Sequence, residues 1–542
     1  MNIIQAENNF KPSDDGKSAE AEHGMVASAF PEATEAGVDI LKGGGNAIDA
    51  ACACALALGV CEPQASGLGG QTMMLIHSGK KTFAIDGSSR APSLAHVNAI
   101  YERDRARGYR ATTVPSTLAT LVYVHQKFGQ LPWAKLVEPA IRIAEDGYKI
   151  TPLQNKLQVR EFDNFNKIES GSGKKYFYKD GYPFAEGDVF KQPELAAVLN
   201  QIADDNVHSF YSGSIAKRID SDMRENGGLL RYDDLALIPW PIERKAMSRR
   251  FRQVRVFTMP PPGAGRVLLF TLAMINAIPQ KRFHKNITKR AHLLAEIFRQ
   301  ALLDRSDRPF DSNFYPQVSE TERMISSKYA FQCITQIARS VDPQIPIRES
   351  FDEMSGETTH LAVMDEFGMA VSLTQSIERA YGSKSAADGL GFLYNNYLMD
   401  FDYKLPSHPF YLRPNATPWS TVAPSILFNG KRLWMAVGSP GSERSISAIT
   451  QFLIHLIDEG MDLDQAMREP RMHCSLGGKL SIEGSGFEDN IVEFFRSRNY
   501  RIDERERYSF YLGAIHAVLK KQEGKGFQGV AEVRRDGSAK GY

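Results

Sequence analysis

The sequence predicts a mixed α/β fold, and three observations support this prediction. Segments with apolar residues at every third or fourth position, as in helices, alternate with short apolar runs typical of strands. Glycine and proline separate most of these segments. No sequence unit repeats at a fixed period, so a solenoid or a propeller is not expected.

The helices expected in the first part of the chain follow from their boundary signals and apolar faces. The first begins at Pro31, because proline fits the first turn of a helix, and ends at the glycines that start with Gly43. Further helices are expected at residues 46–58, 116–128, 133–145 and 288–305, and strands at 72–76 and 82–85. The polar stretch 162–179 is expected to be a surface excursion, and residues 340–356 form the loosest segment.

A β-hairpin that opens on a threonine follows this loose segment. Residues 358–364 and 370–376 have strand patterns, and the acidic and glycine residues at 365–368 are typical of the turn between them. Additional strands are expected at 425–428, 433–437 and 514–520, together with a helix at 445–460.

Length and composition exclude several classes of protein. The 542 residues can bury a large core or divide into two domains. Because 65 Lys and Arg face 64 Asp and Glu, the formal net charge is +1, and the basic field of a nucleic-acid binder is missing. The hydrophobic fraction of 42% and the charged fraction of 24% are average for globular proteins, which excludes collagen-like and wholly disordered chains.

Membrane insertion and export are not expected either. The longest apolar run, residues 47–61, contains Asp49 and is too short to span a bilayer. Residues 1–22 lack the basic and apolar regions of a signal peptide, so we expect them to be a disordered lead-in and the protein to be cytoplasmic. The five cysteines are odd in number, and Cys52 and Cys54 point in different directions on a helix, so core positions in a reducing compartment are expected.

The common cofactor motifs are missing from the sequence. Residues 524–529 match the G-x-G-x-x-G pattern, but the chain ends too soon after them for the crossover helix of a dinucleotide site, so a turn between two strands is expected. There is no G-x-S-x-G elbow, H-E-x-x-H motif, phosphate loop or paired cysteine spacing for zinc. No cofactor and no metal are therefore expected.

From Gly24 to Tyr542 the chain resembles the gamma-glutamyltransferase family in the order and spacing of its motifs. The matching segments are GMVASAFPEATEAGVDILKGGGNAIDAA, SGLGG, FGQLPWAKLVEPAIRIAEDG, NGGLLRYDDLA, MPPPGAG, GETTHLAVMDEFGMAVSLTQS, PWSTVAPS, VGSPGSERS and RRDGSAKGY. The resemblance implies an N-terminal-nucleophile αββα sandwich. It also implies a precursor that cuts itself into a large subunit, residues 23–357, and a small subunit, residues 358–542, which stay together.

The chemistry of Thr358 agrees with this resemblance. A threonine hydroxyl is a weak nucleophile until a base takes its proton, and a free α-amino group with a pKa of ~7.7–8.0 is such a base near neutral pH. Cleavage between Glu357 and Thr358 would create that amine on Thr358 itself. Before cleavage, the same hydroxyl can attack the Glu357 carbonyl and form an ester that water opens.

The resemblance assigns the remaining catalytic groups. Ser376 falls where many relatives have threonine, and its hydroxyl would steady the amino group of the nucleophile. The glycine-rich loop at 438–442 precedes a helix, so its backbone N–H groups can converge on an oxyanion. Gly441 and Ser442 are the expected oxyanion-hole residues, although the Ser442 side chain restricts its backbone more than glycine would.

The substrate pocket departs from the family pattern. An arginine that clamps the α-carboxylate of a glutamyl group is replaced by Ser88, and the nearest arginine is Arg90. Losing a bidentate arginine removes about 1.5–3 kcal/mol of charged hydrogen bonding, so weak use of glutathione is expected. By resemblance, the other pocket positions are Glu378 and Asp400 for a substrate amino group, Tyr397 at a Gln or Glu position, and the hydroxyls of Ser420 and Thr421.

Three functional hypotheses remain open at this point. The leading hypothesis is a self-processing amidohydrolase or acyltransferase of gamma-glutamyltransferase type, which passes an acyl group from Thr358 to water or an amine. The second is a small-amide or acyl-amide hydrolase that resembles oxamate amidohydrolases or cephalosporin acylases, which Ser88 favours. The third is an unprocessed, non-catalytic binding protein.

Overall fold

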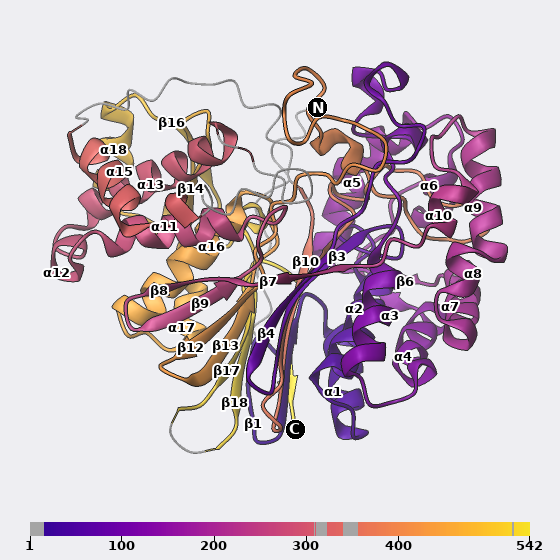
Figure 1. Cartoon of the computed structure of the whole chain (residues 1–542), viewed down its shortest axis with the longest axis horizontal. Coiled ribbons are helices and arrows are strands. Elements are labelled where there is room, and N and C mark those ends of the chain that lie inside the picture. Colours follow the sequence, from indigo (N-terminus) through magenta and orange to yellow (C-terminus); the bar gives the residue numbers. More distant parts are fainter. Residues whose placement is uncertain (1–15, 308, 310–321, 340–355, 523–524) are drawn as a thin grey trace.

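A computed structural model of the chain describes residues 16–307, 309, 322–339, 356–522 and 525–542. Two seven-stranded sheets face each other at its centre, and helices cover both outer sides (Figure 1). The layers are therefore helix, sheet, sheet and helix, and the expected αββα sandwich is confirmed. Among the described residues, none of the helices combines the length and apolar character that a membrane crossing requires.

Both sheets contain strands from the two ends of the chain. The first sheet has the order β1 (Ser18–Ala21), β18 (Phe527–Ala531), β17 (His516–Lys520), β13 (Arg432–Gly438), β12 (Ser425–Asn429), β9 (Val254–Thr258) and β8 (Met247–Phe251). The second has the order β19 (Ser538–Gly541), β2 (Gly24–Ser28), β10 (Thr359–Asp365), β11 (Ala370–Ser376), β3 (Gln71–Ser78), β4 (Lys81–Gly87) and β7 (Ile242–Lys245). All neighbours within these two sheets are antiparallel.

The helices divide between the two outer sides of the sandwich (Figure 1). The outer side of the second sheet carries the first ten helices. They are α1 (Pro31–Lys42), α2 (Ala47–Cys61), α3 (Thr117–Phe128), α4 (Trp133–Asp146), α5 (Pro152–Asn166), α6 (Ser172–Phe177), α7 (Pro193–Asp205), α8 (His208–Tyr211), α9 (Ser214–Glu225) and α10 (Tyr232–Ala236). The other side has α11 (Gly265–Asn276), α12 (Gln280–Phe283), α13 (Ile287–Asp307), α15 (Ser327–Arg339), α16 (Arg444–Leu453), α17 (Leu463–Arg468) and α18 (Asp489–Ser497). Small sheets are formed by β5 (Tyr148–Lys149) with β6 (Val189–Phe190), and by β14 (Met472–Cys474), β15 (Lys479–Glu483) and β16 (Arg501–Arg505).

Helix α2 shows how an acidic residue can sit in an apolar run. Asn46 caps the helix by accepting hydrogen bonds from the N–H groups of Ile48 and Asp49. The buried Asp49 carboxylate accepts the N–H of Asn46 at 3.0 Å and that of Gln130 at 3.1 Å. Asp49 therefore joins the start of α2 to the turn between α3 and α4, and the helix packs directly on β10 and β11.

Hydrophobic side chains fill the space between each pair of layers. The core between the two sheets includes Met25, Ala27, Leu75, Ala362, Ile426, Ala436 and Val518. Larger clusters lie between each sheet and its helices. The five cysteines are all buried and free, as expected for core positions.

Two segments differ from the sequence-based expectations. The expected lead-in does not extend to residue 22, because Ser18–Ala21 already form β1 at the edge of the first sheet, paired with β18. The expected surface excursion at 162–179 is wrong, since it contains the end of α5 and the whole of α6. Phe165 and Phe177 are the reason, because both are buried in the large core beside the second sheet. The loose segment 340–356 lies outside the described residues except for Gly356.

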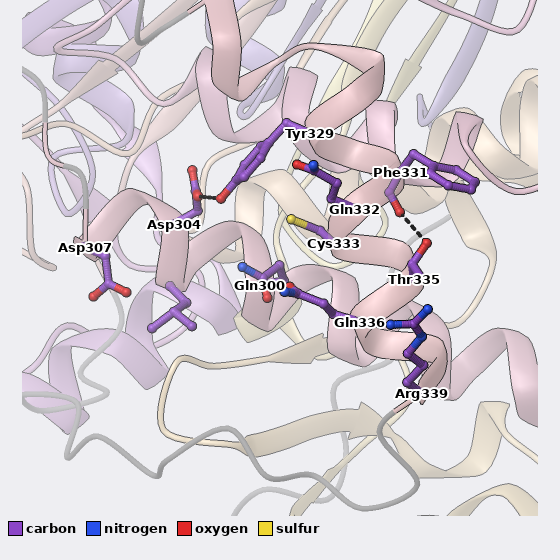
Figure 2. Close-up of a pocket in the computed structure, with 11 residues that line it drawn as sticks. Gln300, Asp304, Asp307, Tyr329, Phe331, Gln332, Cys333, Thr335, Gln336 and Arg339 are labelled. Carbon is purple, nitrogen blue, oxygen red and sulfur yellow. Dashed lines mark hydrogen bonds between the residues drawn. The ribbon is translucent and has the colours of Figure 1, made fainter.

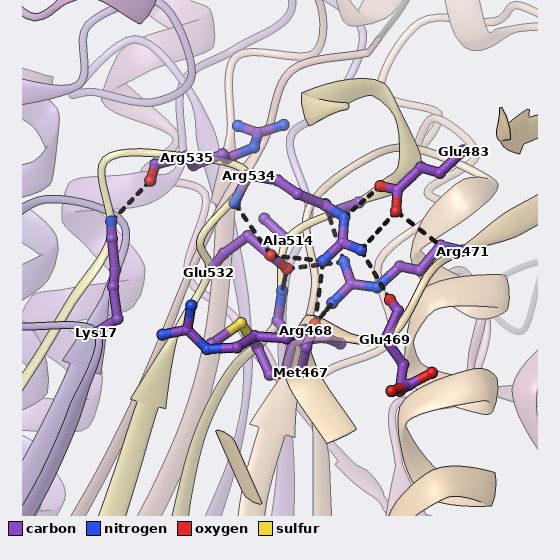
Figure 3. Close-up of polar contacts among 12 residues, drawn as sticks. Lys17, Met467, Arg468, Glu469, Arg471, Glu483, Ala514, Glu532, Arg534 and Arg535 are labelled. Atoms are coloured by element: carbon purple, nitrogen blue, oxygen red, sulfur yellow. Dashed lines mark hydrogen bonds and ion pairs between the residues drawn. The ribbon is translucent and has the colours of Figure 1, made fainter. Parts of the chain in front are cut away.

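A buried arginine–glutamate cluster fixes the end of the chain (Figure 3). Arg534 donates to both carboxylate oxygens of Glu483, at 2.6 and 2.9 Å, and to Glu532 at 2.9 Å. Arg471 pairs with the other Glu532 oxygen at 2.7 Å and donates to the carbonyl of Gly513 at 3.1 Å. Burial alone would raise the pKa of Glu532, but Arg471 and Arg534 lower it to about 2.

Candidate active site

The β10–β11 hairpin brings Thr358 and Ser376 together. Thr359 pairs with Gln375, so the residue before β10 lies beside the last residue of β11. The Thr358 hydroxyl donates to the Ser376 hydroxyl at 3.2 Å, and both residues are buried in the middle of the second sheet. The hydroxyl groups of two residues expected in the site, Thr358 and Ser376, are therefore in direct contact.

Ser376 also binds the carbonyl that precedes Thr358. Its hydroxyl donates to the Glu357 carbonyl oxygen at 2.9 Å and accepts the N–H of Glu378 at 2.8 Å. The N–H of Glu357 donates in turn to the Glu378 carbonyl at 2.8 Å. The peptide bond between Glu357 and Thr358 is thus held by hydrogen bonds, with a hydroxyl donor on the oxygen that would become negative during attack.

Arg535, from the C-terminal motif, holds the other side of this peptide. Its guanidinium donates to the Thr358 carbonyl at 3.4 Å and lies 3.1 Å from the Glu357 carboxylate. The buried Glu62, at the end of α2, is 3.8 Å from the same guanidinium. Burial raises the pKa of Glu62 to about 8 although Arg535 opposes this effect. Neither residue was assigned a role from the sequence, although Arg535 lies in the matching segment RRDGSAKGY; Glu62 lies in none of the matching segments.

The glycine-rich loop after β13, where the oxyanion-hole residues are expected, contains two consecutive residues with positive φ. Gly441 has φ of 118° and Ser442 has φ of 54°, both in the region that favours glycine. Among the described residues, nothing accepts a hydrogen bond from the N–H of either residue. A side chain on Gly438 would collide with the His360 ring at 2.3 Å, so the close contact between this loop and β10 requires glycine.

The uncleaved chain passes through this part of the site. A Cβ atom on Gly356 would lie 3.1 Å from the Ser442 Cβ and 3.4 Å from a Glu378 carboxylate oxygen. Gly356 also forms a β-bridge with Arg379. Gly356, two residues before Thr358, therefore lies between Ser442 and Glu378.

Glu378 and Asp400 form an acidic pair that remains partly exposed beside Ser376. Burial and the nearby Glu378 carboxylate raise the pKa of Asp400 well above its usual value, and burial also raises the pKa of Glu378. The fully buried Tyr397 lies next to both acids, and burial followed by their charges raises its pKa. Two adjacent carboxyl groups of this kind can share a proton or bind a cation.

Ser420 lies against α13, and the carbonyl of Thr421 accepts a hydrogen bond from the Ser445 hydroxyl, in α16, at 3.3 Å. The carbonyl of Ser420 accepts a hydrogen bond from the buried Arg305 at 2.6 Å, and the N–H of Ser420 donates to Pro262 at 3.3 Å. The Arg305 guanidinium lies 4.2 Å from the ring centre of Trp419. No sequence motif indicated Arg305, which stands 53 residues before Thr358 along the chain.

Neither residue considered for the missing clamp is available for that role. Both the N–H and the hydroxyl of Ser88 donate to Asp86, at 3.1 and 2.5 Å, and Asp86 pairs with Arg244 at 2.7 Å. Arg90 donates to the carbonyls of Asp234 and Leu237, at the end of α10. One guanidinium nitrogen of Arg90, Nη2, is therefore held by backbone carbonyls at α10.

A cavity away from these residues includes none of the expected site residues (Figure 2). It measures about 740 Å³ between α13 and α15, where Tyr329 donates to Asp304 at 2.5 Å. In the described part of the chain, no group of three or more His, Cys, Asp or Glu residues could hold a metal ion.

Comparisons with known proteins place these features in a family. The family model described as Gamma-glutamyltranspeptidase matches residues 33–542. The glutathione hydrolase proenzyme of Escherichia coli strain K12 is 31% identical over 527 residues, which cover 93% of this chain and 89% of the relative. The acylase ACY 1 proenzyme of Pseudomonas sp. strain V22 is 30% identical, covering 96% of this chain and 94% of the relative.

Solved structures agree with this placement. The cephalosporin acylase from Bacillus halodurans has a TM-score of 0.87 with 26% identity, and the match covers 100% of this chain and 99% of that one. The Helicobacter pylori gamma-glutamyltranspeptidase has a TM-score of 0.55 with 31% identity, and the match covers 64% of this chain and 100% of that chain. From the family model and the full-length relatives it follows that this chain belongs to the gamma-glutamyltranspeptidase family of N-terminal-nucleophile hydrolases.

Proposed function

We propose that Thr358 is the nucleophile of a self-processing amidohydrolase or acyltransferase. The observation that carries this proposal is the chain of hydrogen bonds from the Thr358 hydroxyl to Ser376 at 3.2 Å and from Ser376 to the Glu357 carbonyl at 2.9 Å. It places a nucleophile and a polarising donor at the same peptide bond.

Self-cleavage proceeds in two steps. The Thr358 oxygen attacks the Glu357 carbonyl carbon, the C–N bond breaks, and the nitrogen of Thr358 takes up the proton that the hydroxyl loses. Water then hydrolyses the ester, which frees the Thr358 hydroxyl and leaves a carboxylate on Glu357. The products are a large subunit, residues 23–357 together with the lead-in, and a small subunit, residues 358–542.

The mature reaction uses the new α-amino group as the base. The neutral amine takes the proton of the Thr358 hydroxyl, which attacks the substrate amide, and the N–H groups of Gly441 and Ser442 stabilise the oxyanion. The leaving amine receives that proton. Water or a second amine then releases the acyl group from Thr358.

Two donor classes are supported, both of them amides of small acyl groups. The relatives named glutathione hydrolase favour γ-glutamyl donors. Acyl amides other than glutathione are favoured by the relatives named acylase and by Ser88, whose hydrogen bonds to Asp86 leave it unable to clamp a carboxylate.

Denaturing electrophoresis and intact mass of purified protein test the proposal. Wild type should yield fragments of 357 and 185 residues, because the sequence has 542 residues and the cut precedes residue 358. Thr358→Ala should remain one chain, whereas Thr358→Ser keeps a hydroxyl and should still be cut. Processing of the alanine variant at the same bond would refute the role of Thr358, and an uncut wild type would favour a binding protein.

A further inference from the structure

A pocket of about 180 Å³ lies where α13, the end of α16 and the start of α18 meet, and none of the residues expected in the active site lines it. Most of its wall is apolar. An apolar cavity of about 150 Å³ is large enough to bind benzene, so this pocket has room for a slightly larger molecule. One side of the wall is a single face of α13, with residues spaced three and four apart: Ile287, Arg290, Ala291 and Leu294.

A second side of the pocket is formed by a π-helical turn that directly follows α16. Ile454–Asp458 form this turn, and two of its residues, Ile454 and His455, line the pocket. Turns of this kind are rare and occur frequently at functional sites. The irregular backbone in the wall is therefore a second observation, independent of the volume, that indicates a binding site.

The basic residue in the wall, Arg290, already has an acidic partner. Arg290 pairs with one Glu459 oxygen, and the Nδ1 atom of His455 lies 2.6 Å from the other. Burial would raise the pKa of Glu459, but His455 and Arg290 lower it to about 2. Glu459 is therefore negative, offsets the charge of Arg290 and accepts the Nδ1 proton of His455. The Nε2 atom of the neutral imidazole is then an acceptor.

The two carboxylates in the wall, those of Glu469 and Glu488, have no basic partner. In the part of the chain that the structure describes, no Lys, Arg or His nitrogen lies within 4.0 Å of either group. Arg534 donates to the backbone carbonyl of Glu469 at 2.8 Å, but the Glu469 side chain points away from Arg471 and Arg534 (Figure 3). Glu488 accepts only the amide of Asn490, at 3.0 Å. The polar groups of the wall that lack a charged partner are therefore all hydrogen-bond acceptors.

We propose that this pocket binds a small organic cation, in which an ammonium group is attached to an aromatic or branched apolar body. The ammonium group donates to Glu469, Glu488 and the Nε2 atom of His455, and the body packs on the apolar wall. An anion of the same size would be repelled by the two carboxylates, and a neutral molecule would leave their charges unpaired. The site is separate from Thr358, so it does not depend on the proposed function.

Three probes with the same ring and different charges test the chemistry of the ligand. Benzylamine is a cation at pH 7, benzyl alcohol is neutral, and benzoate is an anion. Ligand-observed NMR titrations of the purified full chain give the Kd of each. Benzylamine should bind with a Kd of about 1 mM or lower, as expected for so small a molecule. It should bind roughly ten-fold more tightly than benzyl alcohol, because hydrogen bonds to charged groups are stronger, and benzoate should bind most weakly.

Two substitutions in the wall locate the binding. Glu469→Gln removes one charge and should weaken benzylamine binding by roughly three-fold to ten-fold, whereas benzyl alcohol should change by less than about two-fold. Ala291→Met places a longer side chain in the pocket and should weaken the binding of both probes. Glu493→Gln is the matched control, because Glu493 is an exposed acid on α18 that does not line the pocket. Its affinity for benzylamine should stay within about two-fold of wild type.

Equal affinities of the wild type for benzylamine and benzyl alcohol would overturn the proposal, because the pocket would then not select a cation. An unchanged affinity for benzylamine in Glu469→Gln would overturn it as well, since the amine would bind elsewhere, for example at Glu378 and Asp400. If Ala291→Met does not fold, Glu469→Gln decides the question alone, because it keeps the size of the side chain.

Discussion

Removal of the Ser376 hydroxyl tests the mechanism of self-cleavage most directly. This oxygen donates to the Glu357 carbonyl at 2.9 Å, receives the Thr358 hydroxyl at 3.2 Å and receives the Glu378 N–H at 2.8 Å. Ser376→Ala therefore removes the donor on the carbonyl under attack and leaves two donors without their acceptor.

The expected effect on the rate of self-cleavage follows from the hydrogen bond between the Ser376 hydroxyl and the Glu357 carbonyl. A donor aimed at a developing oxyanion is worth about 2.7–4 kcal/mol in the transition state. Since about 1.36 kcal/mol corresponds to a factor of ten in rate, self-cleavage should slow by roughly a hundred-fold to a thousand-fold. The rate is measured by following the appearance of the 185-residue fragment in freshly purified precursor.

Two further substitutions separate the hydroxyl from the volume of the side chain. Ser376→Thr keeps the hydroxyl and should process within about ten-fold of wild type, whereas Ser376→Val has nearly the same shape as threonine and should be as slow as alanine. If Ser376→Val were cut as fast as Ser376→Thr, the hydroxyl would have no role in cleavage and the reasoning above would be wrong.

Three more predictions concern pH, backbone strain and the buried ion cluster. The kcat/KM of the mature enzyme should rise with pH through about 7–8, because only the neutral amine of Thr358 can accept a proton; a profile already flat at about pH 5 would exclude that base. Ser442→Gly should raise the unfolding temperature, since a non-glycine residue at φ of 54° costs about 1 kcal/mol; an unchanged or lower melting temperature would show that no strain is relieved. The depressed pKa of Glu532, about 2, contributes about 3 kcal/mol of stability that is present above about pH 4.3 and lost as the pH falls towards 2. Urea unfolding of uncleaved Thr358→Ala protein should show this loss, and Glu532→Gln in the same background should be less stable at neutral pH and less sensitive to acid; equal acid sensitivity of the two would contradict the assignment.

Elements with clear periodicity could be predicted from the sequence, and those governed by a few buried aromatics could not. The hairpin expected at 358–364 and 370–376 is observed as β10 and β11. No helix was predicted at Pro152–Asn166, although Thr151 and Gln154 form a capping box and Pro152 opens helix α5 there. The cap is visible in the sequence, but burial of Phe165 depends on tertiary packing.

The residues of the candidate site also divide into those that the sequence predicts and those that depend on tertiary packing. Thr358 and Ser376 lie next to each other because strand pairing fixes their register, which sequence spacing can indicate. Arg535 and Glu62 come from the C-terminal segment and the end of α2, and only tertiary packing brings them together beside Thr358. Local sequence patterns do not indicate charged side chains that reach a site only through tertiary packing.

Each of the two sheets contains strands from both sides of the expected cut, which affects how the two fragments would respond to dilution. A cut before Thr358 would leave β2, β3, β4 and β7 on one fragment and β10, β11 and β19 on the other, although all seven belong to one sheet. The first sheet is divided in the same way, with β1, β8 and β9 on one fragment and four strands on the other. The fragments cannot separate without opening interior hydrogen-bond ladders in both sheets, so their association should not depend on concentration in the way that a docked dimer does. Each fragment expressed alone would have incomplete sheets with exposed edge strands. Both fragments would therefore have to fold together to give the active enzyme.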